Sequence, residues 1–370
     1  MRIVIVGGGV AGLAIGWRLA ASGASVDVLE RGIAGRASTW AAAGMLAPAA
    51  EAGHQNDAHA RLCRDARVHW PEFVKALEEA SGIAVGFSEC GSLTVAQSDS
   101  RAQELLERAG AVRANGLRGE WIDAGAARAI EPALAPDSRG ALYAPDDAKV
   151  DNRALPEALT AALRRAGGRL REACAVQSVQ VESGRVTAVT TSAETFAADS
   201  VIVAAGAWSS LLKGVAENIF PPVHPAKGQM ALLRVPAGAA MPRRLVWGEG
   251  IYIVPGREGV LLGATVEDQG YDTSVTREAR DMLFANAART LPVLSGWTVS
   301  ESWAGLRPRT PDGNPALGET AITGLYMATG QFRNGILFAP VVAEILCDLV
   351  LGKNGNANSV AFDPRRFAMS

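Results

Sequence analysis

The sequence predicts an α/β fold in which a domain with a parallel sheet is interleaved with a second, α+β domain built on a mainly antiparallel sheet. A chain of 370 residues exceeds the usual size of a single hydrophobic core, which favours two domains. Residues 1–31 have the pattern of a strand, a glycine turn, a helix and a second strand, which is the order of a βαβ unit. Residues 250–267 have the pattern of two apolar strands joined by a turn that contains glycine, which predicts a hairpin.

The composition favours small-molecule chemistry. Hydrophobic residues make up 48% of the chain, and its formal net charge is −2 with acids and bases well mixed. This distribution offers no basic stripe for nucleic acid and no polybasic patch for anionic lipid. The four cysteines are scattered, and none stands in a CxxC pair or near clustered histidines, so neither a metal site nor a dithiol is expected. These cysteines are Cys63, Cys90, Cys174 and Cys347.

The apolar segments near the two ends of the chain predict neither a signal peptide nor a membrane span. The first segment is broken by glycines 7–9 and continues into a helical pattern. A final apolar helix is expected near 335–351, but it carries Glu344 and Asp348 and is too short to cross a bilayer. Pro340 is expected to remove one hydrogen bond inside this helix and to kink it. We expect a cytoplasmic protein.

The first motif predicts a dinucleotide site of the Rossmann type. Three glycines fit GxGxxG: Gly7 allows the tight turn, Gly9 lets the backbone approach a pyrophosphate, and Gly12 lets helix and strand pack closely. The phosphates would lie over the helix N-terminus. Glu30 ends the second strand, where its carboxylate can accept hydrogen bonds from ribose hydroxyls. The residues expected to hold this part of the cofactor are Gly7, Gly9, Val10, Ala11, Gly12, Glu30 and Arg31.

Later segments favour FAD over NAD. The motif occurs once, and the predicted strands within 198–209 and 324–331 end in small residues that would let a long cofactor pass. The segment 36–48 has two hydroxyls followed by almost no side-chain volume, so it could wrap a pyrophosphate and run beneath a flat ring. An alanine-rich start of a surface helix is the alternative for this segment. The further residues expected along the cofactor are Ser38, Thr39, Ala43, Gly44, Met45, Val176, Ala205, Gly206, Trp208, Arg307, Arg333, Asn334, Gly335 and Ile336.

The remaining pattern divides the chain between the two predicted domains. Helical periodicity at 59–82, a short strand at 91–97 and the hairpin at 250–267 differ in character from the nucleotide-binding segments, to which the chain returns between them and after them. The expected FAD-binding domain comprises residues 1–47, 146–215 and 301–370, and the expected substrate-binding domain comprises residues 48–145 and 216–300.

Four blocks along the chain resemble the D-amino-acid oxidase superfamily of flavoproteins and, within it, the bacterial glycine oxidases of thiamine biosynthesis. The blocks are AAAGMLAP, GIYIVPG, WAGLRPRTPDGNPALG and TGQFRNGILFAP. The resemblance implies that Arg307 pairs with a substrate carboxylate and that Tyr252 and Arg333 lie in the same site. A planar guanidinium suits this task because it offers a bidentate fork and stays charged. The alternatives are a surface salt bridge for Arg307, a core aromatic for Tyr252 and a carbonyl contact for Arg333.

The resemblance also implies a reaction. Glycine or another small amino acid would lose hydride from Cα to flavin N5, its imine would be hydrolysed to a keto acid and ammonia, and O2 would be reduced to H2O2. No obligatory protein base is required, and the histidines at positions 54, 59, 69 and 224 lie outside the motifs, so we expect structural or surface roles for them. The block around Arg307 has no cysteine, so FAD is expected to be bound non-covalently.

Two other functions stay open at this point. One is a related oxidase or dehydrogenase of D-amino acids or N-methyl amino acids such as sarcosine, with a quinone or carrier in place of O2. The other is an FAD-binding module without catalysis, which the paired arginines argue against. Relatives often carry histidine or a similar residue where this chain has Gln331, and the preferred substrate does not follow from the motifs. A homo-oligomer, tetramer or dimer, is expected from the resemblance.

Overall fold

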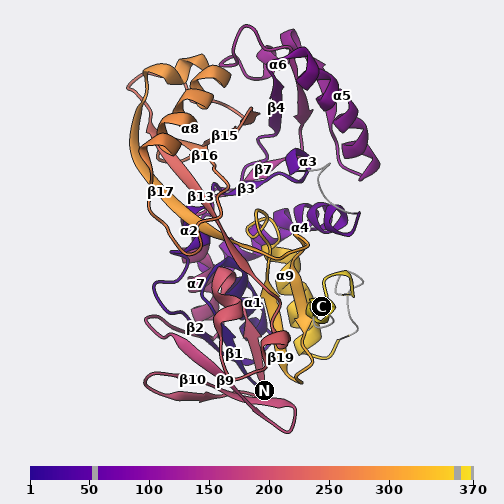
Figure 1. Ribbon diagram of the computed structural model, residues 1–370, viewed down its shortest axis with the longest axis vertical. Helices are drawn as coiled ribbons and strands as arrows, with labels where there is room; N and C mark the ends of the chain where they lie inside the picture. The colour runs from indigo at the N-terminus through magenta and orange to yellow at the C-terminus, as the bar shows by residue number, and fades with distance from the viewer. Residues whose placement is uncertain (52–56, 354–359, 368–370) are drawn as a thin grey trace.

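The structure is a computed structural model that describes residues 1–51, 57–353 and 360–367. It is elongated, with a parallel sheet in one half and a larger sheet in the other (Figure 1). The parallel sheet has six strands, and the strand at one edge, β18, is antiparallel to its neighbour β19. In spatial order these strands are β18 (Ala316–Glu319), β19 (Leu325–Thr329), β12 (Ser200–Val203), β1 (Arg2–Val6), β2 (Ser25–Leu29) and β8 (Arg169–Arg171).

Strand β1 shows why both faces of this sheet are covered. Ile3 and Ile5 point into one hydrophobic cluster with the helices, whereas Val4 and Val6 point into a second cluster with a three-stranded antiparallel sheet. A strand that is buried on both faces has a continuous run of apolar residues, and β1 has such a run from Ile3 to Val6. The helices are α1 (Val10–Ala21), α4 (Asp57–Ser81), α7 (Ala154–Arg165) and α9 (Ala339–Val350). The small sheet consists of β9 (Val176–Glu182), β10 (Arg185–Thr191) and β11 (Thr195–Ala197).

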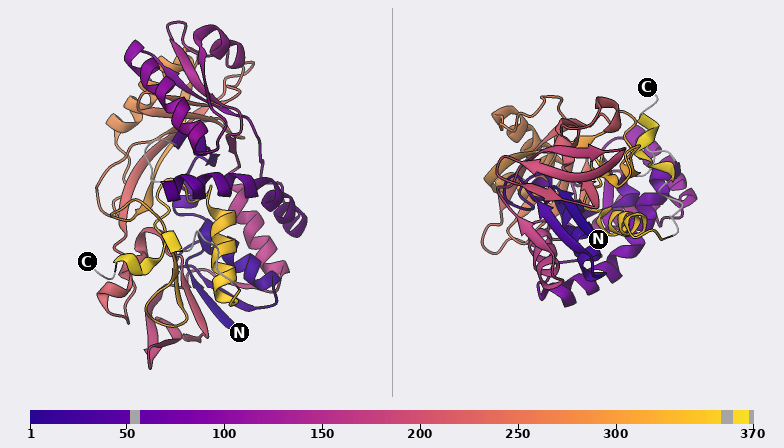
Figure 2. Two further views of the ribbon diagram at one scale, coloured as in Figure 1. Left: turned by 90° about the vertical axis from the view of Figure 1, so that its right-hand side faces the viewer. Right: turned by 90° about the horizontal axis from the view of Figure 1, so that it is seen from below.

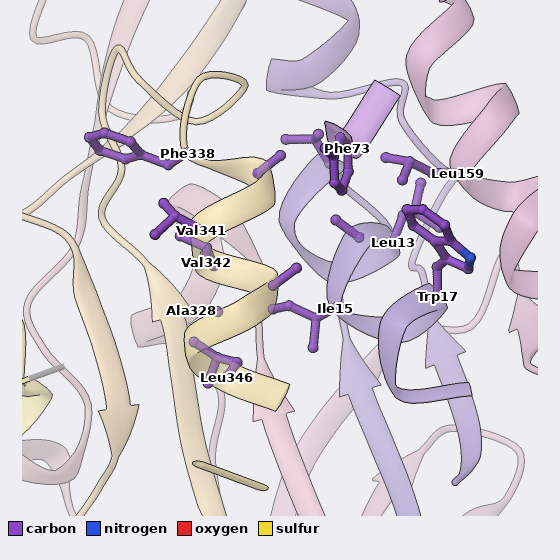
Figure 3. Close-up of a cluster of buried hydrophobic side chains, with 14 of the residues drawn as sticks. Leu13, Ile15, Trp17, Phe73, Leu159, Ala328, Phe338, Val341, Val342 and Leu346 are labelled. Atoms are coloured by element: carbon purple, nitrogen blue, oxygen red, sulfur yellow. The ribbon is translucent and has the colours of Figure 1, made fainter. Parts of the chain in front are cut away.

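The helices on one face pack tightly around α1. Val342 and Leu346 of α9 belong to the same buried cluster as Leu13 and Ile15 of α1, and Phe73 of α4 meets Trp17 with ring centroids 5.6 Å apart (Figure 3). Helix α4 crosses the ends of α7 and α9, as the side view shows (Figure 2). This rigid layer fixes the carboxyl edge of the parallel sheet, where the predicted cofactor residues lie.

The second sheet has eight strands and is mainly antiparallel, as expected, with one parallel pair between β4 and β14. In spatial order its strands are β17 (Thr298–Arg309), β13 (His224–Arg234), β16 (Val260–Gly263), β15 (Ile251–Pro255), β14 (Leu245–Gly248), β4 (Ser92–Ala96), β6 (Gly140–Ala144) and β5 (Glu120–Asp123). The predicted hairpin is the pair β15 and β16. Helices α5 (Asp99–Ala114), α6 (Ala124–Ile130) and α8 (Arg277–Thr290) pack against this sheet.

The last helix differs from the expectation. It begins at Ala339, because the residues from Gly335 to Phe338 form turns before it. Pro340 therefore lies in the first turn of α9, where the backbone N–H has no partner inside the helix and the fixed φ of proline is favourable. The expected loss of an internal hydrogen bond and the expected kink were wrong for this reason.

Two structural facts bear on the division into domains, which stays a prediction. The expected boundary at residue 301 falls inside β17, which pairs with β13 along its length. Helix α4 falls within the segment assigned to the second domain, yet it packs into the helical layer of the first sheet. Within the described residues, no helix is long and apolar enough to cross a membrane.

Candidate active site

A cavity of about 360 Å³ lies between the carboxyl edge of the parallel sheet and one face of the second sheet, a volume within the range of small-molecule sites. All but two of the residues predicted for the site line it. They are Gly7, Gly9, Val10, Ala11, Glu30, Arg31, Ser38, Thr39, Ala43, Gly44, Met45, Val176, Ala205, Gly206, Trp208, Tyr252, Arg307, Arg333, Gly335 and Ile336. The fold therefore brings together segments that are far apart in the sequence.

Gly12 and Asn334 are not among the residues that line the cavity, so their expected contact with the cofactor stays a prediction. A Cβ atom on Gly12 would lie 2.0 Å from the carbonyl oxygen of Gly7, so this glycine lets helix α1 pack closely against the turn, as its place in the motif predicts. The amide of Asn334 is turned toward α4, with its nitrogen 3.2 Å from Nε2 of His59 and 3.8 Å from Sγ of Cys63. Asn334 supports the turn that carries Arg333 from behind.

The glycine turn and Glu30 form one hydrogen-bonded unit at the edge of the parallel sheet. Gly7 adopts a φ of +111° and donates its N–H to the carbonyl of Leu29 at 2.8 Å. The two carboxylate oxygens of Glu30 accept hydrogen bonds from the backbone N–H groups of Gly8 at 2.7 Å and Gly32 at 2.8 Å. Each oxygen keeps a further lone pair, so the carboxylate can also accept from ribose hydroxyls.

The N-terminus of α1 leaves room for phosphate groups. Gly9 caps the helix, and a Cβ atom there would have only Oγ1 of Thr39 within 4 Å, at 3.6 Å. A Cβ on Gly206, which has a φ of +56°, would have no atom of the described residues within 4 Å apart from its chain neighbours. A side chain at either position would enter the cavity that both glycines line, so the residues present fit an extended dinucleotide with its pyrophosphate at this point.

The segment from Ala37 to Met45 forms a floor of small residues and is held from behind. It contains the short helix α2 (Ser38–Ala41) and continues into β3 (Met45–Leu46), so the alternative of a surface helix is wrong. Asn152 donates its side-chain amide to the carbonyl of Trp40 at 2.7 Å. Gly44 approaches the backbone so closely that a Cβ atom would lie 2.0 Å from the carbonyl oxygen of Val150.

One wall of the cavity is aromatic and cationic. The guanidinium carbon of Arg31 lies 3.6 Å from the ring centroid of Trp208, and Tyr271 also stacks with Trp208, at 5.8 Å between centroids. Tyr271 donates its hydroxyl to the carbonyl of Ala207 at 3.0 Å. Because Arg31 follows the same strand as Glu30, this wall lies where the adenosine end of a dinucleotide is expected.

Tyr252 belongs to the face of the second sheet that meets the cavity. Side chains alternate along β15, so Ile251 and Ile253 pack into the cluster around α8 while Tyr252 and Val254 face the other side. The hydroxyl of Tyr252 donates to Sδ of Met230 at 3.0 Å. Tyr252 is thus both a packed aromatic and a lining residue of the cavity, so the two interpretations of it are compatible.

Arg307 reaches the same face from β17. Its Nη1 donates to the carbonyl of Thr265 at 3.1 Å, and among the described residues no ion pair holds it, which leaves the surface salt bridge without support. The guanidinium lies over Gly228 of the neighbouring strand, where a Cβ atom would come within 2.3 Å of Nη1. Glycine at 228 is therefore what makes space for this side chain.

The loop that supplies the Thr265 carbonyl is held by two buried polar side chains of β13. Lys227, only 2% exposed, donates to the Asp272 carboxylate at 2.6 Å. Its hydrogen bond is the main reason that the pKa of Asp272 is lowered to about 2. Gln229 donates to Glu267 at 2.9 Å. The loop 264–276 is thus tied to β13 through Glu267 and Asp272, both of which follow the Thr265 contact with Arg307.

Arg333 is exposed and lines the cavity from the turn before α9. Phe332, the residue before it, adopts a φ of +47°, which is uncommon for a bulky residue and is held by a 2.8 Å hydrogen bond from its N–H to the carbonyl of Pro308. This turn brings Arg333 to the cavity that Arg307 also lines.

Several lining residues were not named individually as site residues from the sequence, although Ala37, Ala41, Ala42 and Gln331 belong to segments expected near the cofactor. They are Val6, Leu29, Ala37, Ala41, Ala42, Ala175, Ala204, Leu211, Leu212, Gly228, Met230, Gly305, Pro308, Ala328, Gln331 and Phe332. Most extend a predicted motif by one or two positions and could have been included with it. Gly228 and Met230 belong to no motif, and only the strand pairing of β13 with β17 places them here.

The histidines take no part in the cavity, within the described part of the chain. His59 is buried and shares a 3.3 Å contact between its Nδ1 and Oδ1 of Asn314, His69 lies 3.4 Å from the Glu344 carboxylate, and His224 is exposed. His54 lies outside the described residues. These positions agree with the structural or surface roles expected for them.

Comparisons with known proteins identify the family. Residues 2–349 match the family of FAD dependent oxidoreductases that is also named DAO. The chain is 36% identical to glycine oxidase of Pseudomonas putida, over 95% of this chain and 94% of the relative. It is also 36% identical to the bifunctional protein ThiO/ThiG of Synechocystis sp., over 99% of this chain but only 54% of the relative. The chain thus spans about half the length of the bifunctional relatives that it matches.

A solved structure agrees with this result. The crystal structure of glycine oxidase from Geobacillus kaustophilus superimposes with a TM-score of 0.92 and 34% identity, and the match covers 99% of both chains. The fold class and the resemblance expected from the sequence are confirmed. The chain belongs to the family of FAD-dependent oxidoreductases, and FAD is the cofactor for which its cavity is built.

Proposed function

We propose that this protein is an amino-acid oxidase that uses FAD to oxidise glycine or another small amino acid to an imine, which water hydrolyses to a keto acid and ammonia. The observation that carries the proposal is the position of Arg307: a half-buried guanidinium on the cavity wall formed by the second sheet, in the cavity that Tyr252 also lines. FAD supplies the acceptor for the hydride that leaves Cα.

Arg307 is proposed to bind the substrate carboxylate. One guanidinium nitrogen is already directed by the Thr265 carbonyl, which restricts the rotamers of the side chain before a ligand arrives. The planar fork then offers parallel N–H donors to a carboxylate, and the two groups remain charged at any working pH. Anchoring the carboxylate fixes the direction of the neighbouring Cα–H bond, which is what hydride transfer requires.

Tyr252 and Arg333 are proposed to complete the substrate end. Tyr252 donates to the thioether of Met230 and can redirect its hydroxyl toward a ligand carboxylate, because a thioether is a weak acceptor. Arg333 adds a second positive charge and, being exposed, is suited to guiding an anionic substrate inward. Among the described lining residues the only carboxylate is that of Glu30, which follows β2, three strands away from the β19 strand that precedes Arg333. The amine of the substrate is therefore proposed to react in its neutral form, without a protein base.

The direct test is anaerobic mixing of the FAD-loaded protein with glycine. Loss of the yellow flavin absorbance is expected, and a flavin that stays oxidised with glycine, D-amino acids and sarcosine alike would leave only a non-catalytic module. Bleaching with sarcosine or a D-amino acid, but not with glycine, would instead favour the related oxidases and dehydrogenases. Admitting O2 and measuring H2O2 then tests the proposed acceptor, since a dehydrogenase would reoxidise slowly and release little peroxide.

The FAD is proposed to be bound non-covalently. No cysteine is among the described residues that line the cavity, so no thiol is available there to tether the flavin. Precipitation of the protein with acid should release all of the yellow colour into the supernatant, and colour retained in the pellet would contradict this.

The wider setting is also a proposal. Similarity to ThiO/ThiG supports a role in thiamine biosynthesis, in which the imine made from glycine would feed synthesis of the thiazole. A cytoplasmic location and a homo-oligomer, tetramer or dimer, are proposed with it, and sedimentation of the purified protein measures the latter.

A further inference from the structure

Gln331 carries a buried amide that the protein itself leaves unsatisfied. Its residue is 5% exposed, and its Nε2 has no hydrogen-bond partner among the described residues. Burying an N–H donor without a partner is unfavourable, and native proteins contain few such groups. The position therefore calls for an acceptor that is not part of the polypeptide.

The location of Gln331 distinguishes it from the other buried nitrogens that lack partners. Within the described residues these are Nε of Arg244 and Nε1 of Trp247, and neither of those residues lines the cavity. Gln331 does line it. The space that could hold an acceptor for its amide is thus the space in which FAD is accommodated.

The strand order indicates which part of FAD lies beside Gln331. This residue follows β19, whereas Glu30 follows β2, and the two strands are separated by β12 and β1. Three steps of about 4.8 Å place the two positions roughly 14 Å apart along the sheet edge. On the other side, the neighbouring Phe332 is bonded to Pro308, next to Arg307. Gln331 therefore lies at the substrate end of the cavity and away from the adenosine end.

We propose that the Nε2 group of Gln331 donates a hydrogen bond to an acceptor atom of the isoalloxazine ring, and that this bond strengthens FAD binding and raises the reduction potential of the flavin. The ring carbonyl oxygens and ring nitrogens gain negative charge on reduction, so a fixed donor stabilises the reduced form more than the oxidised form. The proposal rests on FAD occupying this cavity and is independent of which amino acid is oxidised.

The test compares apoprotein and holoprotein of Gln331→Leu, which keeps the volume and removes the donor. In the apoprotein the substitution removes an unsatisfied polar group, so the melting temperature should stay equal or rise. In the holoprotein the Kd for FAD should increase about tenfold, as expected for loss of one hydrogen bond. The reduction potential, measured by dye equilibration, should fall. None of these readouts requires turnover of an amino acid.

Gln229→Leu is the matched control, because Gln229 is also a buried amide but is fully bonded. It accepts from the N–H of Thr276 at 2.7 Å and donates to Glu267 at 2.9 Å. Its loss should lower the melting temperature of the apoprotein, opposite to the Gln331 variant. A lower apoprotein melting temperature for Gln331→Leu, with Kd and potential unchanged, would overturn the proposal and assign Gln331 a purely structural role. Gln331→Met repeats the measurement if the leucine variant does not fold.

Discussion

The two walls of the cavity are built in different ways. The wall at the edge of the parallel sheet is made of backbone and small residues: Gly9 and Gly206 leave no side chain toward the cofactor, and Gly7 and Gly44 let neighbouring backbone segments approach closely. The wall from the second sheet presents long side chains, among them Arg307. The first wall is suited to hold a large, constant cofactor by close backbone approach. The second is suited to select a small ligand, because its side chains can change without altering the strands that carry them.

The two walls also differ in how they depend on the rest of the chain. The first is held by local turns and by hydrogen bonds such as the one from Asn152 to the carbonyl of Trp40. The second depends on the pairing of β13 with β17, which places Gly228 under Arg307. Substitutions that disrupt the first wall should therefore abolish cofactor binding. Substitutions that disrupt the second wall should leave FAD bound and weaken the binding of the substrate.

The largest effect is expected from Gly44→Ala. The new Cβ would lie 2.0 Å from the Val150 carbonyl oxygen at a φ of +73°, so the floor of the cavity must shift. We expect the free energy of unfolding to fall by about 4 kcal/mol and FAD to be lost. Urea denaturation and FAD fluorescence titration measure the two effects.

Gly184→Ala provides the control for backbone strain. It has a similar φ of +75°, but in the described part of the chain only its own neighbours lie within 4 Å of the added Cβ. This variant should lose only about 1 kcal/mol and retain FAD. Equal losses for both glycines would show that strain, and not the close approach to Val150, governs the cofactor wall.

A second effect concerns Asp147, which ties strand β4 of the second sheet to the segment that follows the cavity floor. Its carboxylate accepts from the Ser92 hydroxyl of β4 at 2.6 Å and from the N–H of Ala49, in the short helix α3 (Pro48–Glu51), at 3.3 Å. Burial raises the pKa of this carboxyl to about 7 despite those bonds. The folded state therefore prefers the protonated form.

The sign of the pH dependence follows from that raised pKa. The stability contributed by Asp147 is complete below pH 3.8, the ordinary value, and is lost as the pH rises toward 7. Asp147→Asn should remove this dependence, so that wild type loses on the order of 3 kcal/mol relative to the variant between pH 4 and pH 8. Urea denaturation at both pH values measures it, and parallel curves for the two proteins would contradict it.

Arg307→Leu should act on the second wall alone. Removing one bidentate, charge-assisted contact should lower kcat/KM for glycine about 100-fold, or roughly 2.7 kcal/mol. Arg309→Leu is the control: it is on the same strand, is exposed and does not line the cavity, and its guanidinium lies 5.7 Å from the Phe332 ring centroid. Equal losses in both variants would remove the special role of Arg307.

The smallest effect is expected from Lys227→Met. This change removes a buried cation and leaves the Asp272 side chain, which is 48% exposed, to be solvated by water. The loop that holds Arg307 through Thr265 should loosen, raising KM for glycine about fivefold, near 1 kcal/mol, while kcat and FAD content stay close to wild type. Arg277→Met is the control: the Arg277 side chain is 81% exposed and pairs with Asp281 beyond the loop, so its loss should leave KM, kcat and FAD content unchanged. Loss of FAD from Lys227→Met would show that the loop serves the cofactor wall instead.

The sequence predicted the first wall better than the second, for a physical reason. The turn at Gly7, the acid at Glu30 and the floor around Gly44 belong to contiguous motifs whose spacing is set by local backbone geometry. Gly228 and Met230 reach the cavity only through strand pairing across the chain, which no local pattern encodes. Asn334 belongs to a recognisable motif, yet packing against α4 turned its amide away from the cavity.

The same distinction explains the differences in the fold. The βαβ unit and the hairpin of β15 and β16 follow from local patterns and were predicted correctly. The parallel pairing of β4 with β14 joins segments that lie far apart in sequence and was not foreseen. The start of α9 at Ala339 depends on the turn that the preceding residues form around Phe332, which the apolar pattern of the helix does not reveal.

The separation of the two walls is tested most directly by the Kd for FAD of the Arg307→Leu variant, measured by quenching of flavin fluorescence on titration into apoprotein. If the first wall holds the cofactor and Arg307 serves the substrate, this Kd should stay within about threefold of the wild-type value, less than 1 kcal/mol. A Kd weakened tenfold or more would contradict the account, because it would make Arg307 part of the cofactor's binding site.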